Sequence, residues 1–232
     1  HALYVSTGGP GHLDPRRNDG REGSQGIVED PAWEGPLFAL FDAIRNDPQA
    51  SLIAVCHSFG LMCRWLGVAE AVLRGPERGG KSVGVRYNEL LPAGRAHPWF
   101  SRFAAQLRDG SHFPVLDNRL YDLVPTGAVP ADVRLLAHDC DASGAPTDAV
   151  TMLEVASGAS DGVPRMLGVN HHPEIVNRHR QIALLEKKRA RGGVNETWFD
   201  ERWAALTGQV EDDAGDRLLH LTSHYTLMGP IR

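Results

Sequence analysis

The sequence is poor in cysteine, lacks a long hydrophobic run and has no excess of basic residues. Its three cysteines, Cys56, Cys63 and Cys140, are too few and too widely spaced for a disulfide framework or a paired metal-binding motif. No apolar stretch reaches the roughly 18 residues of a membrane-spanning helix, and the N-terminus lacks the pattern of a secretion signal. We therefore expect a cytoplasmic protein with no membrane association, no metal and no cofactor.

The charge balance excludes another class of partner. With 24 basic and 29 acidic residues the formal net charge is -5, and the isoelectric point is near 6.1. Such a chain offers no basic surface for tracking phosphates, so direct nucleic-acid binding is not expected. The length of 232 residues suits a single α/β domain with a sizeable core.

Short apolar runs alternate with helical patterns along the chain. Five runs, partly β-branched, are typical of strands buried on both faces; they cover residues 3–5, 52–55, 133–137, 151–155 and 166–169. Between the first two runs, Leu37, Leu40, Phe41 and Ile44 follow the i, i+3, i+4, i+7 spacing of an amphipathic helix. The sequence therefore predicts an α/β fold with an open, mostly parallel sheet and helices on both faces.

The remaining segments of the main domain predict smaller elements. We expect a surface hairpin strand at 82–90, a short helix from His97, a strand at 113–116 and a hairpin turn at 139–146. The first strand leads at once into a glycine-rich turn. In a parallel sheet an earlier strand and helix normally precede such a turn, so we expect them upstream of His1.

The C-terminal part has a different character. A basic helix is predicted over 178–191, a helix capped by Asn195 follows, and residues 217–227 predict a last helix. We expect a main domain over residues 1–191 and a helical extension over 192–232 that packs on it or on a second subunit of a homodimer. Trp198, Phe199 and Trp203 recur at helical spacing, which favours a core role over a cofactor site.

Cys56 stands where a buried strand passes directly into a predicted helix that ends at Gly67. A nucleophile elbow has this arrangement, because a sharp turn there pushes the side chain into a cleft at the carboxyl edge of the sheet. Ala54 and Ser58 are small enough for the turn, and the helix N-terminus favours thiolate over thiol. From this segment alone, an inert buried cysteine is an equally good interpretation.

Two distant segments favour the nucleophile. Gly8-Gly9-Pro10-Gly11 follows the first strand, and its Gly9 amide, with the amide of His57, can receive the charge of a tetrahedral intermediate. Taken alone, this loop is better interpreted as a plain tight turn. The second segment, His172-Pro173-Glu174, follows the last apolar run, and its carboxylate can orient the imidazole as acid and base for the thiol. A solvated histidine pair or a metal site is the alternative, but the spacing lacks the helical zinc pattern.

The three segments together resemble the class I (triad) glutamine amidotransferases, including the amidotransferase domain of GMP synthase. That family carries, in this order, a Gly-Gly-Pro-Gly loop, a Gly-x-Cys-x-Gly elbow and a Gln-Phe-His-Pro-Glu segment. Here the elbow reads Ala54-Val55-Cys56-His57-Ser58 and the last segment Asn170-His171-His172-Pro173-Glu174. The resemblance covers about residues 2 to 186 and implies a flavodoxin-like, three-layer α/β/α fold.

The resemblance also implies a reaction. Cys56, His172 and Glu174 are expected to hydrolyse the side-chain amide of glutamine, or of a related γ-glutamyl amide, through a thioester that releases ammonia. In the family the ammonia usually passes to a synthetase, which this chain does not encode, so a separate synthetase subunit or a stand-alone hydrolase is implied. The substrate-binding positions are then expected at Gly8, Gly11, Gly60, Asn118 and Arg119.

This sequence departs from the family at the substrate positions. The family commonly has Gln four residues after the nucleophile, where it helps to hold glutamine, whereas Gly60 stands there in this chain. The family's His-containing segment reads Asp117 to Tyr121. The identity of the amide substrate is therefore open.

Two other interpretations also stay open. The pair Cys56-His57 is similar to the elbow of the DJ-1/PfpI superfamily of cysteine hydrolases, in which the adjacent histidine can take part, but that likeness leaves the His-Pro-Glu segment unexplained. The second is a non-catalytic member of the fold, whose cleft binds a ligand.

Overall fold

The computed structural model describes residues 2–21, 24, 26–127, 129–155, 162–176, 178–207 and 213–231. The strands are β1 (Ala2–Ser6), β2 (Ala50–Val55), β3 (Ala69–Leu73), β4 (Ser82–Leu90), β5 (His112–Arg119), β6 (Tyr121–Pro125), β7 (Val133–Cys140), β8 (Pro146–Val155) and β9 (Met166–Val169). The helices are α1 (Glu34–Asn46), α2 (His57–Leu66), α3 (Pro92–Arg95), α4 (Phe100–Ala104), α5 (Arg178–Ala190), α6 (Glu196–Thr207) and α7 (Asp213–Ser223).

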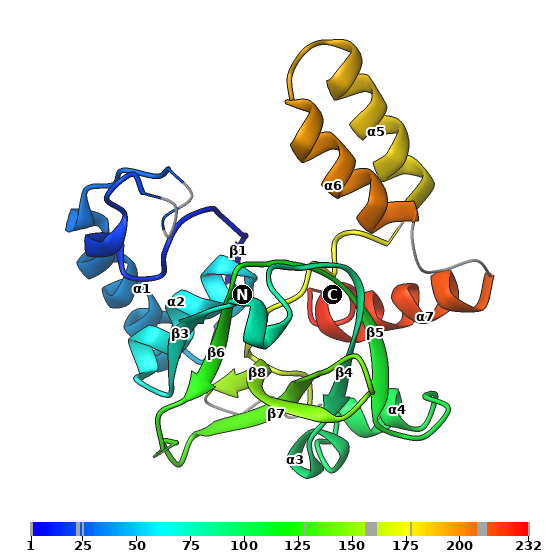
Figure 1. Cartoon of the computed structure of the whole chain (residues 1–232). Coiled ribbons are helices and arrows are strands. Elements are labelled where there is room, and N and C mark those ends of the chain that lie inside the picture. The colour runs from blue at the N-terminus through cyan, green and yellow to red at the C-terminus, as the bar shows by residue number, and fades with distance from the viewer. Residues whose placement is uncertain are drawn as a thin grey trace.

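Seven strands form one curved sheet in the order β1-β2-β9-β8-β7-β4-β5 (Figure 1). The pairs β1–β2 and β2–β9 are parallel, and the four remaining pairs are antiparallel. The predicted α/β fold is confirmed, and the sheet is mixed: the expected parallel pairing holds at one end only. The antiparallel end arises because β7 and β8 are joined by a short hairpin turn at residues 141–145, and such a turn can connect only antiparallel strands.

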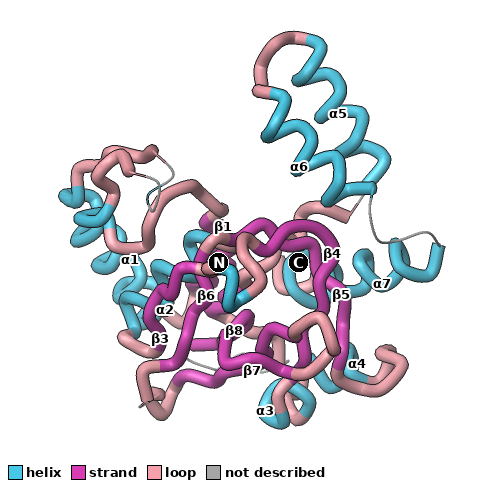
Figure 2. The backbone as a smooth tube through the Cα atoms, viewed as in Figure 1, coloured by secondary structure: helices cyan, strands magenta, loops and turns pink. Residues whose placement is uncertain are grey.

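Helices cover both faces of this sheet, as predicted (Figure 2). On one face α1 and α2 pack through Phe41, Phe59 and Met62 against Leu52 and Leu153. On the other face Phe100 and Phe103 of α4 and Tyr225 pack against Ile53 and Val169. Leu52 and Ile53 belong to opposite clusters because successive side chains of a strand point to opposite faces. The apolar runs at 52–55, 151–155 and 166–169 are therefore strands buried on both faces, as predicted, whereas the run at 3–5 is a largely exposed strand.

Strand β1 lies at the edge of the sheet and pairs with β2 alone. Leu3 is 44% exposed and Val5 49% exposed, although β2 beside them is buried on both faces. The expectation that a strand and a helix precede β1 concerns residues upstream of the chain and stays a prediction.

Two smaller predictions need correction. The strand over 82–90 was expected at the surface, but β4 is an inner strand between β7 and β5, and Val85 and Leu90 are buried. The last helix was expected over 217–227, but α7 begins at Asp213 and a wider, π-helical turn, His224–Met228, follows it. The apolar stripe of α7 is carried by Leu219 and Leu221, so periodicity alone did not reveal its polar first turn.

The C-terminal helices contact the sheet at its β4–β5 end. Helices α5 and α6 form a hairpin that projects from the body of the molecule, and α7 runs beside β5 (Figure 1). The hydroxyl of Thr222 donates to the carbonyl oxygen of Pro114 at 2.8 Å, and Phe199 and Leu206 join a cluster with Val85 and Leu116. Residues 208–212 and 232 of the predicted extension lie outside the described residues, and the division into two domains stays a prediction.

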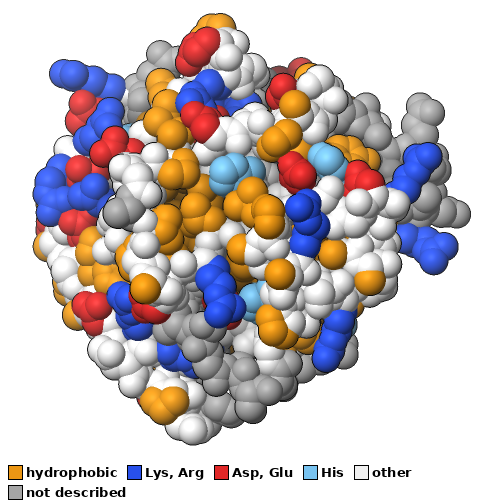
Figure 3. All heavy atoms as spheres, turned by 90° about the horizontal axis from the view of Figure 1, so that it is seen from below, with side chains coloured by type: hydrophobic (Ala, Val, Ile, Leu, Met, Phe, Trp, Pro, Cys, Tyr) orange, Lys and Arg blue, Asp and Glu red, His pale blue; other side chains and the backbone are white. Residues whose placement is uncertain are grey.

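The surface carries mixed charge. In the view from below, basic and acidic side chains are interspersed over the face, and hydrophobic side chains gather towards its middle (Figure 3). No helix within the described residues is long and apolar enough to cross a membrane.

Candidate active site

Cys56 occupies a strained backbone conformation between β2 and α2. Its φ of 54° and ψ of -111° make it the one non-glycine residue of the described chain with positive φ. Its amide donates to the carbonyl oxygen of Val169 on β9 at 2.8 Å, which pins the corner to the neighbouring strand. A conformation of this kind costs about 1–3 kcal/mol and persists only where the surroundings impose it. The strand and the helix, both buried, impose it here, and they produce the geometry of a nucleophile elbow.

The residue two places after Cys56 connects the elbow to the glycine loop. The hydroxyl of Ser58 donates to the carbonyl oxygen of Thr7 at 2.5 Å and lies 2.7 Å from the hydroxyl of Ser6. Ser58 replaces the glycine that is common in the family, and the replacement gives this chain a fixed link between β1 and α2.

Gly8 brings the loop against the two reactive side chains. A Cβ atom at this position would lie 3.2 Å from Cβ of Cys56 and 3.3 Å from Cε1 of His172. Any side chain would therefore crowd both residues. The close approach explains why glycine stands here, and it places the Gly8-Gly9 backbone beside the thiol.

Both the ring and the backbone of His172 are held by polar contacts. Its Nδ1 lies 2.7 Å from Oε1 of Glu174, and its backbone amide donates to the carbonyl oxygen of Leu116 at 2.8 Å. Its Nε2 is buried and has no hydrogen-bond partner within the described residues, and the thiol of Cys56 is near enough to act on the ring electrostatically. Burial alone would lower the pKa of His172, but the interactions with Cys56 and Glu174 outweigh burial and raise this pKa to about 10.

Replacing Glu174 with glutamine should lower the pKa of His172. The substitution removes a negative charge from Nδ1 while keeping a polar partner of the same shape, and loss of an opposite charge disfavours the imidazolium. Titration of the histidine rings by NMR should show the ring of His172 losing its proton at lower pH in the variant. An unchanged titration would mean that Glu174, which is half-exposed, does not act on this ring.

The other cysteines and the neighbouring histidine lie in different environments. Burial raises the pKa of Cys63, and burial together with nearby carboxylates raises the pKa of Cys140 to about 12. Burial lowers the pKa of His171 to about 3, and its Nε2 lies 3.2 Å from the hydroxyl of Thr226. These thiols stay protonated and His171 stays neutral near neutral pH, so Cys56 and His172 are the candidate reactive pair.

A cavity of about 380 Å³ opens beside Cys56 and His172. Most of the residues predicted from the sequence line this cavity: Gly9, Gly11, Cys56, His57, Gly60, Asn118, Arg119 and His172. Gly8 lies behind the thiol and Glu174 behind the imidazole, so neither lines it. The amide of His57 is the first of α2, where N–H groups have no partner within the helix and are available to an anion.

Gly60 has no polar side chain that could contact a substrate, unlike the Gln that the similar family commonly has at this position. A Cβ atom at Gly60 would lie 2.5 Å from both methyl carbons of Leu13. Leu13 therefore occupies the space that a longer side chain at position 60 would need. The wall of the cavity is therefore apolar at the point where the similar family commonly has the side-chain amide of Gln.

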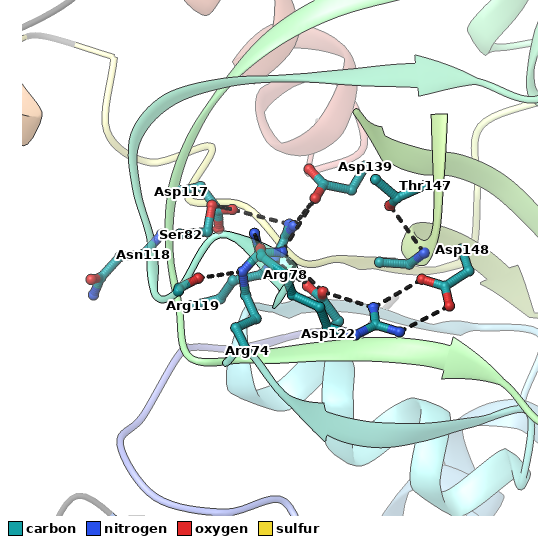
Figure 4. A network of polar contacts seen from close by, with 12 residues as sticks. Arg74, Arg78, Ser82, Asp117, Asn118, Arg119, Asp122, Asp139, Thr147 and Asp148 are labelled. Atoms are coloured by element: carbon teal, nitrogen blue, oxygen red, sulfur yellow. Dashed lines mark hydrogen bonds and ion pairs between the residues drawn. The ribbon is translucent and has the colours of Figure 1, made fainter. Parts of the chain in front are cut away.

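Arg119 lies at the edge of the cavity, but its charge is already compensated. Its guanidinium lies 3.0 Å from Asp117 and 3.1 Å from Asp122, and it also contacts Asp139 (Figure 4). All four side chains are buried. Burial would lower the pKa of Arg119, but the three aspartates outweigh it and raise this pKa. The structure thus gives Arg119 carboxylate partners within the protein, in place of a substrate.

The same network extends to two further arginines. Arg74 donates to both oxygens of Asp122 at 2.7 and 2.9 Å, and Arg78 joins Asp122 to Asp148 (Figure 4). The network ties the loop after β3 to strands β5, β6, β7 and β8. Asn118 points away from it (Figure 4) and lines the cavity. We refer to these three arginines and four aspartates as the Arg119 network.

Replacing Arg119 with methionine should destabilise the fold by about 3–5 kcal/mol, because removing one partner of a buried ion pair leaves uncompensated charge. Urea unfolding of the two proteins measures the difference. Arg108→Met is the matched control, since Arg108 is exposed and a surface change of this kind is expected to stay within about 0.5 kcal/mol. Equal stability of the two variants would contradict a structural role for the Arg119 network.

Sequence reasoning missed several residues of the cavity, among them Leu13, Leu123, Asn170, Lys81 and Trp198. Asn170 is 4% exposed, and its Nδ2 has no partner within the described residues. Lys81, in the loop before β4, and Trp198, in α6, also line the cavity. Asn170 lies two residues before His172, so its closeness to the His-Pro-Glu segment was a signal that could have identified it. The residues around Lys81 and Trp198 carry no pattern that indicates the cavity. Within the described residues, no group of three or more His, Cys, Asp or Glu side chains could hold a metal ion.

Comparisons with known proteins place the fold. No family model matches the sequence, and no curated protein matches it. A glutamine amidotransferase from Thermotoga maritima has a similar structure, with 12% identity, a TM-score of 0.57, and coverage of 100% of this chain and 79% of that one. A glutamine amidotransferase from Methylobacillus flagellatus has 12% identity and a TM-score of 0.49, with coverage of 98% and 94%.

At 12% identity such a similarity establishes the fold and not the reaction. The motif order, the mixed sheet and the similar structure agree. The chain therefore has the fold of a class I glutamine amidotransferase domain.

Proposed function

We propose that the protein is a cysteine amidohydrolase that hydrolyses the side-chain amide of glutamine or a related γ-glutamyl amide. One observation carries the proposal: a thiol on a strained elbow and an imidazole held by Glu174 meet in one cavity. Each group has the surroundings that its step requires, and the three segments that supply them are far apart in the sequence.

The first step forms a thioester. The Cys56 sulfur attacks the amide carbonyl carbon, and the amides of Gly9 and His57 receive the negative charge that develops on the carbonyl oxygen. His172 enters this step as an imidazolium, because its raised pKa keeps the ring protonated at neutral pH. It gives its proton to the leaving nitrogen as the C–N bond breaks, so ammonia departs and a γ-glutamyl thioester remains.

The second step returns the enzyme to its starting state. The ring of His172, now neutral, takes a proton from a water molecule that attacks the thioester carbonyl. The C–S bond breaks, glutamate leaves and the thiolate is restored. The balance is one amide and one water consumed, and one carboxylate and one ammonia produced.

The fate of the ammonia belongs to the proposal as well. In a cytoplasmic amidotransferase of this fold, a separate synthetase subunit would receive it; a stand-alone hydrolase would release it. This chain supplies the hydrolytic half in both cases.

The proposal is tested with the purified protein and a set of γ-glutamyl amides that includes L-glutamine. We expect ammonia release that a glutamine-analogue electrophile abolishes, and peptide mass spectrometry should find the adduct on Cys56 alone. If no amide yields ammonia and Cys56 stays unmodified, the proposal is wrong, and a ligand-binding role becomes the better account.

A further inference from the structure

The C-terminal helical hairpin contributes a side chain to the candidate active cavity. Trp198, near the start of α6, lines the cavity although it lies 142 residues after Cys56 in the sequence. Its backbone amide donates to Oδ1 of Asn195 at 2.8 Å, which fixes the first turn of the helix. An element outside the catalytic segments thus forms part of the wall.

The hairpin is held in place by its own apolar cluster. Phe199 and Leu206 of α6 and Leu185 of α5 are buried against Val85 and Leu116 of the sheet. Trp198 is only partly buried, and two cations lie near its ring, Lys188 at 5.9 Å and Arg202 at 5.6 Å from the ring centroid. Phe199 is buried in this cluster and Trp198 and Trp203 pack against it, as their spacing predicted, but Trp198 is only partly buried and also keeps surface at the cavity.

Apolar surface also lies next to the elbow. Leu13 fills the space beside Gly60, and Leu120 and Leu123 line the same cavity. A ligand as polar as free glutamine would leave much of this wall without a matching group. Burial of an apolar substituent against aromatic and aliphatic side chains is favourable, because it removes their surface from water.

Among the described residues, Lys81 and Arg119 line the cavity together with the imidazolium of His172. Arg119 is compensated by three aspartates, whereas Lys81 forms no ion pair with any of the described residues and lines the cavity. The buried amide of Asn170 adds an unpartnered donor. A substrate carboxylate is therefore best matched by Lys81, with Asn170 available for a second polar contact.

We infer that this cavity selects an amide that carries both a carboxylate and an apolar or aromatic group, in preference to free glutamine, and that Trp198 contacts the apolar group. The inference rests on the proposed function and narrows its substrate class. The apolar group can be attached to the leaving nitrogen or to the acyl part of the substrate. In both positions it would be bound by the same apolar contacts.

Three substrates distinguish the two positions of the apolar group. All three have the γ-amide and the α-carboxylate. L-Glutamine has no apolar group, γ-L-glutamyl-4-nitroanilide carries one on the leaving nitrogen, and N-carbobenzoxy-L-glutamine carries one on the acyl side. We expect kcat/KM for at least one substituted amide to exceed that for glutamine about tenfold or more, a usual ratio for one apolar group in a fitting site.

Two variants then assign the residues. Trp198→Ala should remove the preference by raising KM for the substituted amide about tenfold relative to glutamine, and Trp198→Phe should retain the preference. Lys81→Gln should raise KM for all three substrates, because all three carry the carboxylate. Lys187→Gln is the matched control, since Lys187 is exposed on α5 and does not line the cavity.

Each outcome decides the inference. Equal or better hydrolysis of glutamine overturns it, and so does a preference that survives Trp198→Ala. Hydrolysis of none of the three, with Cys56 unreactive, overturns the proposed function itself. If Trp198→Ala unfolds, calorimetric binding of the substituted amide to Cys56→Ala and to Cys56→Ala/Trp198→Leu supplies the comparison. Weaker binding to the double variant supports the contact, and equal binding overturns it.

Discussion

Replacing Cys56 with alanine is expected to lower amide hydrolysis by at least about 10⁴-fold, because loss of the nucleophile of a catalytic unit removes the covalent route altogether. The fold should be retained, since alanine is small and the side chain is only partly buried. Alanine also carries positive φ with difficulty, but the native cysteine carries the same strain. Ammonia release under substrate saturation measures the loss.

Cys140→Ala is the matched control for this variant. Cys140 lies at the end of β7, outside the cavity, so its replacement should leave hydrolysis within about twofold. If Cys56→Ala kept more than a hundredth of the wild-type rate, the thiol would not be the nucleophile, and the strained elbow would need another explanation.

Replacing His172 with alanine is expected to cost about 10³–10⁴-fold in kcat, because the leaving nitrogen then departs without a proton and the thiol loses its neighbouring cation. Alkylation of Cys56 by iodoacetamide at about pH 6.5 should slow in the variant, since the ring that interacts with the sulfur is gone. His220→Ala, an exposed histidine on α7, is the control and should change neither rate.

The raised pKa of His172 also has a consequence for stability. The pKa in the folded protein is about 10, above the ordinary value of 6.5, so the folded state binds this proton more tightly than the unfolded state does. The resulting stabilisation is fully present below about pH 6.5 and is lost as pH rises through about 10. The free energy of unfolding of wild type relative to His172→Ala should therefore fall between these values. A constant difference would contradict the elevated pKa.

The parts of the molecule that depend on local pattern were predictable from the sequence. The apolar runs in β2, β8 and β9 identified strands because their residues are buried on both faces, and the spacing of Leu37, Leu40, Phe41 and Ile44 identified α1. The three motifs converge because strands carry each of them to one edge of the sheet. Asn195 was predictable as a cap, since its side chain bonds the first turn of α6.

The parts that depend on distant pairing were not predictable. Nothing in the sequence near Gly60 reveals that Leu13 fills its space, because the contact joins two segments 47 residues apart. Arg119 was a reasonable ligand for a carboxylate, but the fold turns the nearby Asp117 and Asp122 and the distant Asp139 of β7 towards its guanidinium. Trp198 has the same helical spacing as its buried neighbours, and only its position beside the cavity in the folded chain distinguishes it.

The two sides of the cavity are built from interactions of different kinds. The Arg119 network is largely buried, so salt in the solvent screens it weakly, whereas the hairpin carries exposed pairs such as Arg189 with Glu196. Raising the ionic strength should therefore weaken the exposed ion pairs of the hairpin and leave those of the Arg119 network nearly unchanged. The thiol and its imidazole would keep their positions across a wide range of salt, while the wall that carries Trp198 would adjust, so that the choice of substrate becomes more sensitive to the medium than the chemistry is.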